Sequence, residues 1–283
     1  MKLLFLCLLA FGCGTEPTPK PRPMPIPRPI PKPKPKPKPE IPKPEPIDNY
    51  CASDANFRGQ GKFRTASKTV GKIKVTYPVD TNGCDTIPAT FCNGTGGNLW
   101  MFRAHAQKLA SHGFYVSSYE TTQSGSGRQA MEAIDYAISQ GAVSELAIIG
   151  GMSQGGQCAA STAYKYEQKY GGLAAVNPMV PAFGMSNPNF RREIPQIKSP
   201  FFMFNGSADR TVSKAWVSAG WSLVKSSPSY FYTANGAGHV NSVRWAEDAL
   251  LPFALYVLFD RQDAKEYFEY LPNAPEWSLV DKK

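Results

Sequence analysis

The stretch AIIGGMSQGGQCAAS, residues 147–161, decides the fold of this 283-residue chain. Its apolar run, Ala147 to Ile149, stops at two glycines. The serine at position 153 is followed by two more glycines and then by small residues that favour a helix. A buried strand that passes into a helix through such a turn is typical of proteins with a parallel sheet. We therefore predict a sharp turn with Ser153 at its centre, between a strand and a helix.

On both sides of this turn, strand-like and helix-like segments alternate along the chain. The predicted strands are 72–79, 87–94, 114–120, 146–150, 172–178, 200–209 and 229–239, and the predicted helices are 100–113, 127–142, 154–170 and 242–260. Strands separated by helices favour a mostly parallel sheet that is covered by helices on both faces. With 42% apolar residues the chain can fill one sizeable core, and we predict a single α/β domain over residues 50–283.

The glycines around Ser153 point to a particular chemistry. Residues 151–155 match the pattern G-x-S-x-G, which exposes a nucleophilic serine when it follows a strand and precedes a helix. Glycines at the flanking positions avoid collisions between the strand and the helix. The N-terminus of that helix favours negative charge where an oxyanion would develop. The alternative is a glycine-rich turn whose serine has no chemical role.

A serine hydroxyl needs a base and an orienting carboxylate before it attacks a carbonyl carbon. Of the three histidines, His105 and His112 lie in or at the end of an amphipathic helix, where surface or packing roles are expected. His239 lies on a glycine-containing loop and is the predicted base. Asp209 follows an apolar strand and is the predicted carboxylate, unless it is only a turn or capping residue. Glu120, at another strand end, is the reserve candidate. The order serine, aspartate, histidine is that of the α/β-hydrolases.

Two backbone amides are expected to hold the oxyanion that forms during acyl transfer. One is predicted to be the amide of Gln154, directly after the serine. The other is expected from the loop NGTGG, residues 93–97, and is assigned to Thr95. The alternative is that these glycines form only a loop.

Four segments resemble the bacterial cutinase and poly(ethylene terephthalate) hydrolase group, within the dienelactone-hydrolase and chlorophyllase-like α/β-hydrolases. They are IPATFCNGTGGNLWMFRAHAQKLASHGFYV (87–116), GMSQGG (151–156), NGSADRTV (205–212) and GAGH (236–239), and the resemblance extends over residues 72–260. It implies the α/β-hydrolase fold, ester hydrolysis through an acyl-enzyme, and no cofactor or metal in the chemistry. By the same match, Thr95 and Gln154 form the oxyanion hole.

The sequence departs from this group beside the expected substrate cleft. Where the polyester hydrolases commonly have a tryptophan, the segment NPMVPAFG (177–184) offers Phe183, displaced along the chain. Met152 stands where the group usually has histidine or tryptophan. Trp100, Met152 and Phe183 are the candidates for the cleft, and a core role is equally expected for Trp100 and Phe183. Activity on aromatic polyester is therefore not predicted from these residues.

The predicted function is that of a serine carboxylesterase acting on short-chain acyl esters, on cutin-like or synthetic polyesters, or on ester groups of a polysaccharide. A non-catalytic envelope protein that uses the same fold for binding is the alternative from another class. A lipase is the third alternative, although no amphipathic lid insertion is evident between Ser153 and Asp209.

The formal charge of +9 raises the question of an acidic partner. Much of this charge lies in the first fifty residues, and the rest of the chain is only mildly basic. Aromatic and basic residues do not interleave as they do in proteins that bind single-stranded nucleic acid. A solvated surface, rather than a nucleic-acid partner, is expected.

The N-terminus has the features of an export signal. Residues 1–12 carry one lysine and an apolar run that is too short to span a membrane as a helix. The pair Gly12-Cys13 resembles the bacterial lipobox, which implies a lipid anchor on Cys13, although Ala10 stands where leucine is usual. Residues 13–49 alternate proline with basic and apolar residues and favour an extended polyproline II linker. We expect an envelope lipoprotein or a secreted protein, with the linker as a tether or as a basic arm for an anionic polymer.

Four cysteines follow this linker, namely Cys51, Cys84, Cys92 and Cys158. An exported compartment permits disulfides, and the spacing does not match a metal-ligand pattern. Cys51 and Cys84 lie in turn-like sequence and are expected to pair. Cys92 and Cys158 have core-like neighbours and are expected to be buried thiols.

Overall fold

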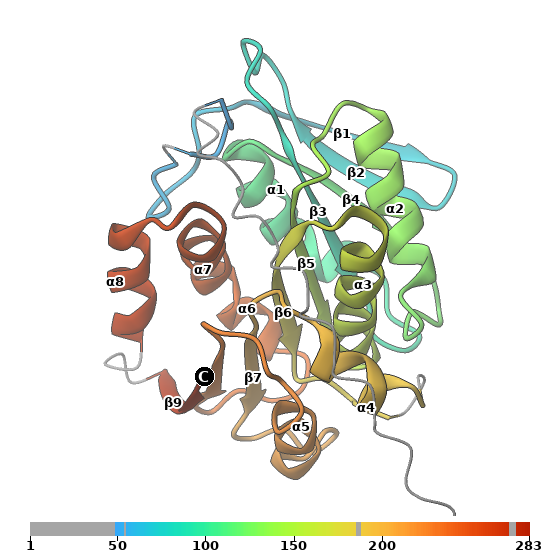
Figure 1. The fold of residues 1–283 in the computed structure, drawn as a ribbon, viewed down its shortest axis with the longest axis vertical. Coiled ribbons are helices and arrows are strands. Elements are labelled where there is room, and N and C mark those ends of the chain that lie inside the picture. The colour runs from blue at the N-terminus through green and yellow to red at the C-terminus, as the bar shows by residue number, and fades with distance from the viewer. Residues whose placement is uncertain (1–48, 54, 185–187, 272–275) are drawn as a thin grey trace, which may run out of the picture. The chain divides into compact units, whose positions relative to one another are not determined.

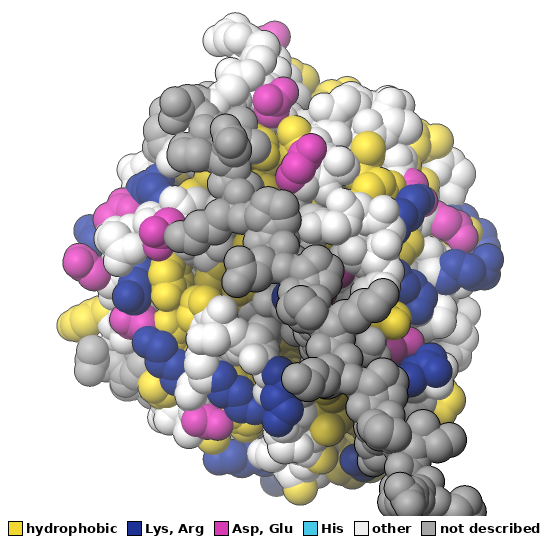
Figure 2. Space-filling model, viewed as in Figure 1, with side chains coloured by type: hydrophobic (Ala, Val, Ile, Leu, Met, Phe, Trp, Pro, Cys, Tyr) yellow, Lys and Arg dark blue, Asp and Glu magenta, His cyan; other side chains and the backbone are white. Residues whose placement is uncertain are grey.

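The computed structural model describes residues 49–53, 55–184, 188–271 and 276–283 (Figure 1). The predicted export signal, Cys13 and the proline-rich linker up to residue 48 lie outside the described residues. In the described part of the chain, no helix is long and apolar enough to cross a membrane. On the face shown in Figure 2, Lys and Arg side chains are interspersed with Asp, Glu and apolar side chains.

One nine-stranded sheet organises the described residues. Its strands are β1 (Thr65–Val70), β2 (Ile73–Pro78), β3 (Ile87–Cys92), β4 (Phe114–Tyr119), β5 (Leu146–Met152), β6 (Leu173–Met179), β7 (Phe202–Gly206), β8 (Tyr230–Ala234) and β9 (Trp277–Lys282). Their order across the sheet is β1-β2-β4-β3-β5-β6-β7-β8-β9. The neighbours from β4 to β8 in this order pair in parallel, and the pairs that involve β1, β2 or β9 are antiparallel.

Helices cover both faces of this sheet, as Figure 1 shows. They are η1 (Leu99–Phe102), α1 (Arg103–Ser111), α2 (Arg128–Ser139), α3 (Gln154–Tyr170), α4 (Phe190–Glu193), η2 (Ile194–Gln196), α5 (Lys214–Trp221), α6 (Ser242–Trp245), α7 (Glu247–Phe259) and α8 (Gln262–Tyr270). One core cluster lies between the sheet and α1, α7 and α8, and a second lies between the sheet and α2, α3 and α5. This is the α/β-hydrolase fold, so the predicted fold is confirmed.

The two core clusters exist because the central strands are apolar on both faces. In β8, Tyr230 and Tyr232 enter the cluster beneath α7 and α8, while Phe231 between them enters the cluster beneath α5. Successive side chains of a strand point to opposite faces, so a strand buried on both sides needs apolar residues throughout. The parallel strands also bring their C-terminal ends to one edge of the sheet, where loops can carry reactive groups.

The predicted segments correspond to β2 through β8 and to most helices. The expected helix over 242–260 is divided into α6 and α7 at Ala246. The sequence did not predict β1, β9, α4, η2, α5 and α8. Both missed strands lie at the ends of the sheet and are mostly exposed, so they lack the apolar pattern by which strands are recognised.

Two disulfides join the four cysteines of the domain. Cys51 pairs with Cys84, as expected. Cys92 and Cys158 are also bonded to each other, so the expectation of free thiols at these positions was wrong. Both residues are buried as expected, but α3 packs over the end of β3 and brings them together. That contact depends on the tertiary fold, which the spacing of the two cysteines does not reveal.

His105 is a core residue of α1, in agreement with the packing role expected for it. Its ring is 3% exposed and contacts Phe91 and Phe102 edge-on, with centroids 5.6 and 6.0 Å apart. Neither ring nitrogen has a hydrogen-bond partner in the described part of the chain. Burial, aided by the nearby Lys108 cation, lowers the pKa of His105 from 6.5 to about 4. The folded protein therefore holds a neutral imidazole here.

We predict that His105 contributes to loss of stability in acid. The unfolded chain takes up a proton below pH 6.5, whereas the folded protein resists it until about pH 4, so stability falls as the pH drops through this window. A shift of this size corresponds to about 3 kcal/mol. Urea unfolding of wild type and His105→Leu at several pH values should show a shallower decline for the variant. Burial lowers the pKa of His112 as well, so the difference between the two proteins is diagnostic. Parallel declines would contradict the prediction.

Candidate active site

Ser153 is the single residue between β5 and α3, and its backbone is in a rarely populated conformation. Its φ is 60° and its ψ is −121°. A strained non-glycine residue of this kind costs about 1–3 kcal/mol and persists only where its surroundings fix it. The amide of Ser153 donates to the carbonyl of Met179 at 3.0 Å. Its carbonyl accepts from the amides of Gly156 at 2.9 Å and Ala182 at 3.0 Å, so the turn is held on both sides.

Glycine is required around this turn because the chain passes very close to its neighbours. A Cβ atom on Gly151 would lie 2.2 Å from the carbonyl oxygen of Gly155. One on Gly155 would lie 2.0 Å from the carbonyl oxygen of Cys92, and one on Gly156 would lie 2.8 Å from Pro181. The glycines thus allow α3 to start directly against β3 and the segment after β6. The half-buried Ser153 hydroxyl makes no hydrogen bond within the described residues.

Asp209 and His239 meet at the same edge of the sheet. Asp209 follows β7, His239 follows β8, and Asp209 Oδ2 lies 2.8 Å from His239 Nδ1. The Asp209 carboxylate is fully buried, and its Oδ1 accepts from the amides of Thr211 at 2.7 Å and Val212 at 2.9 Å. These donors hold the carboxylate in place. A carboxylate on Nδ1 selects the imidazole tautomer that leaves Nε2 free to accept a proton.

A close backbone approach brings the loops of Asp209 and His239 together. A Cβ atom on Gly206 would lie 2.3 Å from the carbonyl oxygen of Ala237, so only glycine fits there. The amide of Ala208 donates to the same carbonyl at 3.0 Å. Ser153 lies at the end of β5, two strands from β7, so all three predicted residues share the carboxyl edge of the sheet. Among the described residues, the structure joins Asp209 to His239 by a hydrogen bond and does not join Ser153 to either.

The loop after β3 lies beside the Ser153 turn. A Cβ atom on Gly94 would be 3.3 Å from the carbonyl oxygen of Met152 and 3.4 Å from Ser153 Cβ. Thr95 follows at once and is exposed. Within the described part of the chain, the amides of Thr95 and Gln154 donate to no carbonyl. Neither of the two amides predicted for the oxyanion hole is thus taken up by a backbone carbonyl of the described residues.

Asn93 fixes the shape of this loop, and the sequence analysis did not single it out. The side chain is fully buried, and its Nδ2 donates to the carbonyls of Gly94 at 2.8 Å, Gly97 at 3.1 Å and Thr121 at 2.5 Å. A polar residue at the end of an apolar strand was the feature of the sequence that could have indicated a structural role for Asn93. Asn93 links the loop after β3 to the loop after β4.

The side chain of Gln154 holds the loop after β4 from the other side. Its Oε1 accepts from the amide of Ser124 at 3.3 Å, and its Nε2 donates to Gln123 Oε1 at 2.9 Å. Ser124 Oγ in turn donates to the carbonyl of Asn93 at 2.6 Å. Gln154 thus contributes a free amide at the turn and a side chain that supports the surrounding loops. The Cys92–Cys158 disulfide lies next to this network, between β3 and α3.

The three candidates for the substrate cleft occupy different environments. Phe183 packs in the core against Phe190, with ring centroids 5.9 Å apart, and against Gly220 of α5. Met152 is also buried. Trp100 is 69% exposed at the start of η1. Of the three, only Trp100 presents a large surface to solvent.

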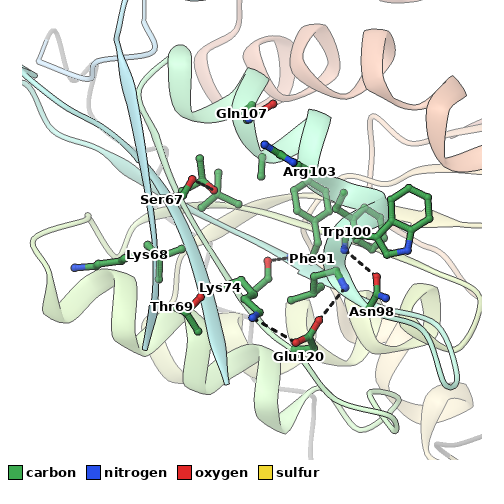
Figure 3. A pocket seen from close by; sticks show the side chains of 17 residues that line it. Ser67, Lys68, Thr69, Lys74, Phe91, Asn98, Trp100, Arg103, Gln107 and Glu120 are labelled. Atoms are coloured by element: carbon green, nitrogen blue, oxygen red, sulfur yellow. Dashed lines mark hydrogen bonds and ion pairs between the residues drawn. The ribbon is translucent and has the colours of Figure 1, made fainter. Parts of the chain in front are cut away.

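A groove of about 520 Å³ does not have Ser153, Asp209 or His239 among its lining residues. Figure 3 shows it between α1 and the strand pair β1–β2, with Trp100 and Asn98 at one side. Glu120 lies in this groove, where its carboxylate is 3.6 Å from Lys74 Nζ and accepts from the amide of Leu99 at 3.5 Å. Because Asp209 occupies His239 Nδ1, Glu120 is not needed as the reserve carboxylate. Among the described residues, no group of three or more His, Cys, Asp or Glu side chains is arranged to hold a metal ion.

Comparison with protein families agrees with this architecture. Residues 101–227 match the family model described as phospholipase/carboxylesterase. The matched region contains Ser153 and Asp209, while Thr95 and His239 lie outside it. A search of curated proteins finds no match to this sequence. The match supports an α/β-hydrolase with hydrolase chemistry, and it does not distinguish the cutinase-like group.

We predict that Gly155→Ala destabilises the protein by roughly 2–4 kcal/mol, because the new methyl group would collide with the backbone of β3. Thermal unfolding should show a clearly lower midpoint. Gly59→Ala is the matched control, since a Cβ atom there meets nothing within 4 Å. Equal midpoints for the two variants would show that the packing at Gly155 does not require glycine.

Proposed function

We propose that this protein is a serine carboxylesterase in which Ser153 is the nucleophile, His239 the general base and Asp209 the orienting carboxylate. The observation that carries the proposal is the 2.8 Å contact between Asp209 Oδ2 and His239 Nδ1 at the sheet edge where Ser153 sits in its strained turn. The family description phospholipase/carboxylesterase supports the same reaction class.

The reaction would proceed in two halves. As Ser153 Oγ bonds to the ester carbonyl carbon, its proton passes to His239 Nε2, and the buried Asp209 carboxylate stabilises the imidazolium. The tetrahedral intermediate then expels the alkoxide, which takes the proton from His239. Water attacks the acyl-enzyme by the same route. The carboxylic acid leaves and the Ser153 hydroxyl is restored.

The oxyanion would be held by the amides of Gln154 and Thr95. Gln154 begins α3, so the positive end of the helix faces the developing charge. The closeness of Gly94 to Ser153, where a Cβ atom on the glycine would lie 3.4 Å from Ser153 Cβ, supports the assignment of the Thr95 amide. Each such donor is worth about 3 kcal/mol of barrier.

We propose short-chain acyl esters or polyesters as substrates, following the resemblance to the cutinase and poly(ethylene terephthalate) hydrolase group. The burial of Phe183 removes one candidate for the aromatic clamp of the polyester hydrolases, and Trp100 is the one of the three cleft candidates that is exposed. A lipase or phospholipase is the alternative that the family description favours. The proposal further places the protein in the cell envelope or outside the cell, anchored through a lipid on Cys13 and extended by the proline-rich linker.

We predict covalent labelling of Ser153 by a fluorophosphonate, because this reagent reports a serine activated by a base. The folded wild-type protein should form the adduct, and Ser153→Ala should not. The same variant should lose hydrolysis of p-nitrophenyl butyrate. Mass spectrometry of the labelled peptide checks the site. Absence of any adduct in folded wild-type protein would favour the non-catalytic binding protein.

We predict that Asp209→Asn lowers kcat by about four orders of magnitude, since an amide cannot select the correct imidazole tautomer. The KM should change little, because Asp209 is buried behind His239. Asp135→Asn is the control, as Asp135 also accepts hydrogen bonds, from Lys169 and Tyr170, but lies on α2. Similar kcat values for the two variants would exclude Asp209 from the mechanism.

We predict faster hydrolysis of short than of long acyl chains in a p-nitrophenyl ester series. In the described part of the chain between α3 and Asp209 the only helices are the short α4 and η2, so no long lid helix is present, and Ser153 does not line the groove of about 520 Å³. Steady-state kcat/KM across the series, with a polyester film measured alongside, checks this. Turnover restricted to long chains would favour the lipase alternative.

A further inference from the structure

The loop after β4 is hydrogen-bonded to the loop that carries Thr95. The Asn93 side chain donates to the carbonyl of Thr121 at 2.5 Å, and the amide of Gly96 donates to the carbonyl of Thr122 at 3.3 Å. Thr95 lies between these two points of attachment. The position of the Thr95 amide therefore depends on where the loop after β4 is held.

The same loop is also bound to the first turn of α3. Gln154 Nε2 donates to Gln123 Oε1 at 2.9 Å, and Gln154 Oε1 accepts from the amide of Ser124 at 3.3 Å. Gln154 is buried, and its own backbone amide is the other one proposed for the oxyanion hole. The residue that supplies one of the two amides is thus attached to the loop that holds the other.

Ser124 joins these two sets of contacts. Its amide donates to the Gln154 side chain, and its Oγ donates to the carbonyl of Asn93 at 2.6 Å, two residues before Thr95. Ser124 is 3% exposed and Asn93 is fully buried. Because bulk water does not reach this pair, loss of the hydroxyl would leave a buried carbonyl without that donor.

An oxyanion hole is sensitive to such a link, because both donors must reach one oxygen atom at once. Effective donors lie about 2.7–3.1 Å from the position that the oxyanion will occupy. Without the bond from Ser124 to Asn93, the loop of Thr95 could shift relative to α3. The cost would appear in the transition state, where the charge develops, more than in the binding of the neutral ester.

We propose that Ser124 is a positioning residue that holds the amides of Thr95 and Gln154 at a fixed spacing. It acts through the carbonyl of Asn93 and the side chain of Gln154 and contacts no reacting atom. The role of the two amides in catalysis rests on the proposed function, whereas the ordering of the Thr95 loop by Ser124 does not.

The test removes the hydroxyl with Ser124→Ala and measures hydrolysis of p-nitrophenyl butyrate. We expect kcat to fall about tenfold, which is less than the loss caused by removal of a whole oxyanion donor. The KM should change little. Inhibition by butane-1-boronic acid, whose tetrahedral adduct with a serine resembles the intermediate, should weaken by a similar factor. The pH dependence of kcat should keep its midpoint, because the contact between Asp209 and His239 is unaltered.

Ser117→Ala is the matched control. Ser117 is a fully buried serine of β4, and its Oγ donates to the carbonyl of Ala133 in α2 at 2.7 Å. This variant loses the same kind of buried hydrogen bond, but on the side of α2. It should keep the wild-type kcat even where its stability falls as much as that of Ser124→Ala. Equal losses of kcat in the two variants, or a loss in Ser124→Ala that appears only as a higher KM, would overturn the proposal.

Gln154→Met tests the other end of the link and decides the matter if Ser124→Ala does not fold. It keeps the backbone amide and a side chain of similar length, but it cannot bond to Gln123 or to the amide of Ser124. We expect the same pattern, with a lower kcat and little change in KM. A wild-type kcat in folded Gln154→Met would contradict the proposal.

Hydrogen exchange gives a measurement that does not depend on activity. Peptides covering residues 93–99 should exchange faster in Ser124→Ala than in wild type, and at the wild-type rate in Ser117→Ala. Unchanged exchange in Ser124→Ala would overturn the positioning role. Faster exchange, together with a wild-type protein that neither hydrolyses the ester nor binds the boronic acid, would instead overturn the proposed function alone.

Discussion

The contact between the first turn of α3 and the end of β3 is the constraint on which the candidate site depends. Gly155 lies so close to the carbonyl of Cys92 that no side chain fits between them. This approach sets the start of α3, and with it the strained Ser153 turn and the free amide of Gln154. It also places the loop after β3 beside the serine. Strain at Ser153 is thus maintained by packing around it, as expected for a strained residue in a functional site.

The second half of the site is assembled by a separate contact on the other side of β6. Gly206 allows the turn after β7 to contact the loop after β8. One oxygen of the buried Asp209 carboxylate accepts hydrogen bonds from amides of its own loop, and the other lies against His239. The sheet relates the two halves, and so does the segment after β6, where the amide of Ala182 donates to the carbonyl of Ser153 and the amide of Val180 donates to the carbonyl of Phe204 in β7. Rigid strands that end at one edge therefore position groups that are distant in sequence.

Features that depend on local sequence patterns could be predicted from the sequence. Glycine spacing around Ser153 implies a strand, a turn and a helix, and each of these is present. The disulfide between Cys92 and Cys158 was not predicted, because the contact between the two cysteines depends on the packing of α3. The strands β1 and β9 were not predicted, because these exposed edge strands lack an alternating apolar pattern. Asn93 was not singled out, since its three carbonyl partners come from loops that the sequence does not order. The roles of Ser153 and its partners remain predictions about chemistry.

The Cys92–Cys158 bond closes a covalent ring across a sequence separation of 66 residues. Thr95 and Gln154 both lie inside this ring, together with the exposed segment at Thr122 and Gln123. Exposed loop tips are preferred points of proteolytic nicking. A single cut there would leave the two fragments joined through the disulfide, with Thr95 on one fragment and Gln154 on the other.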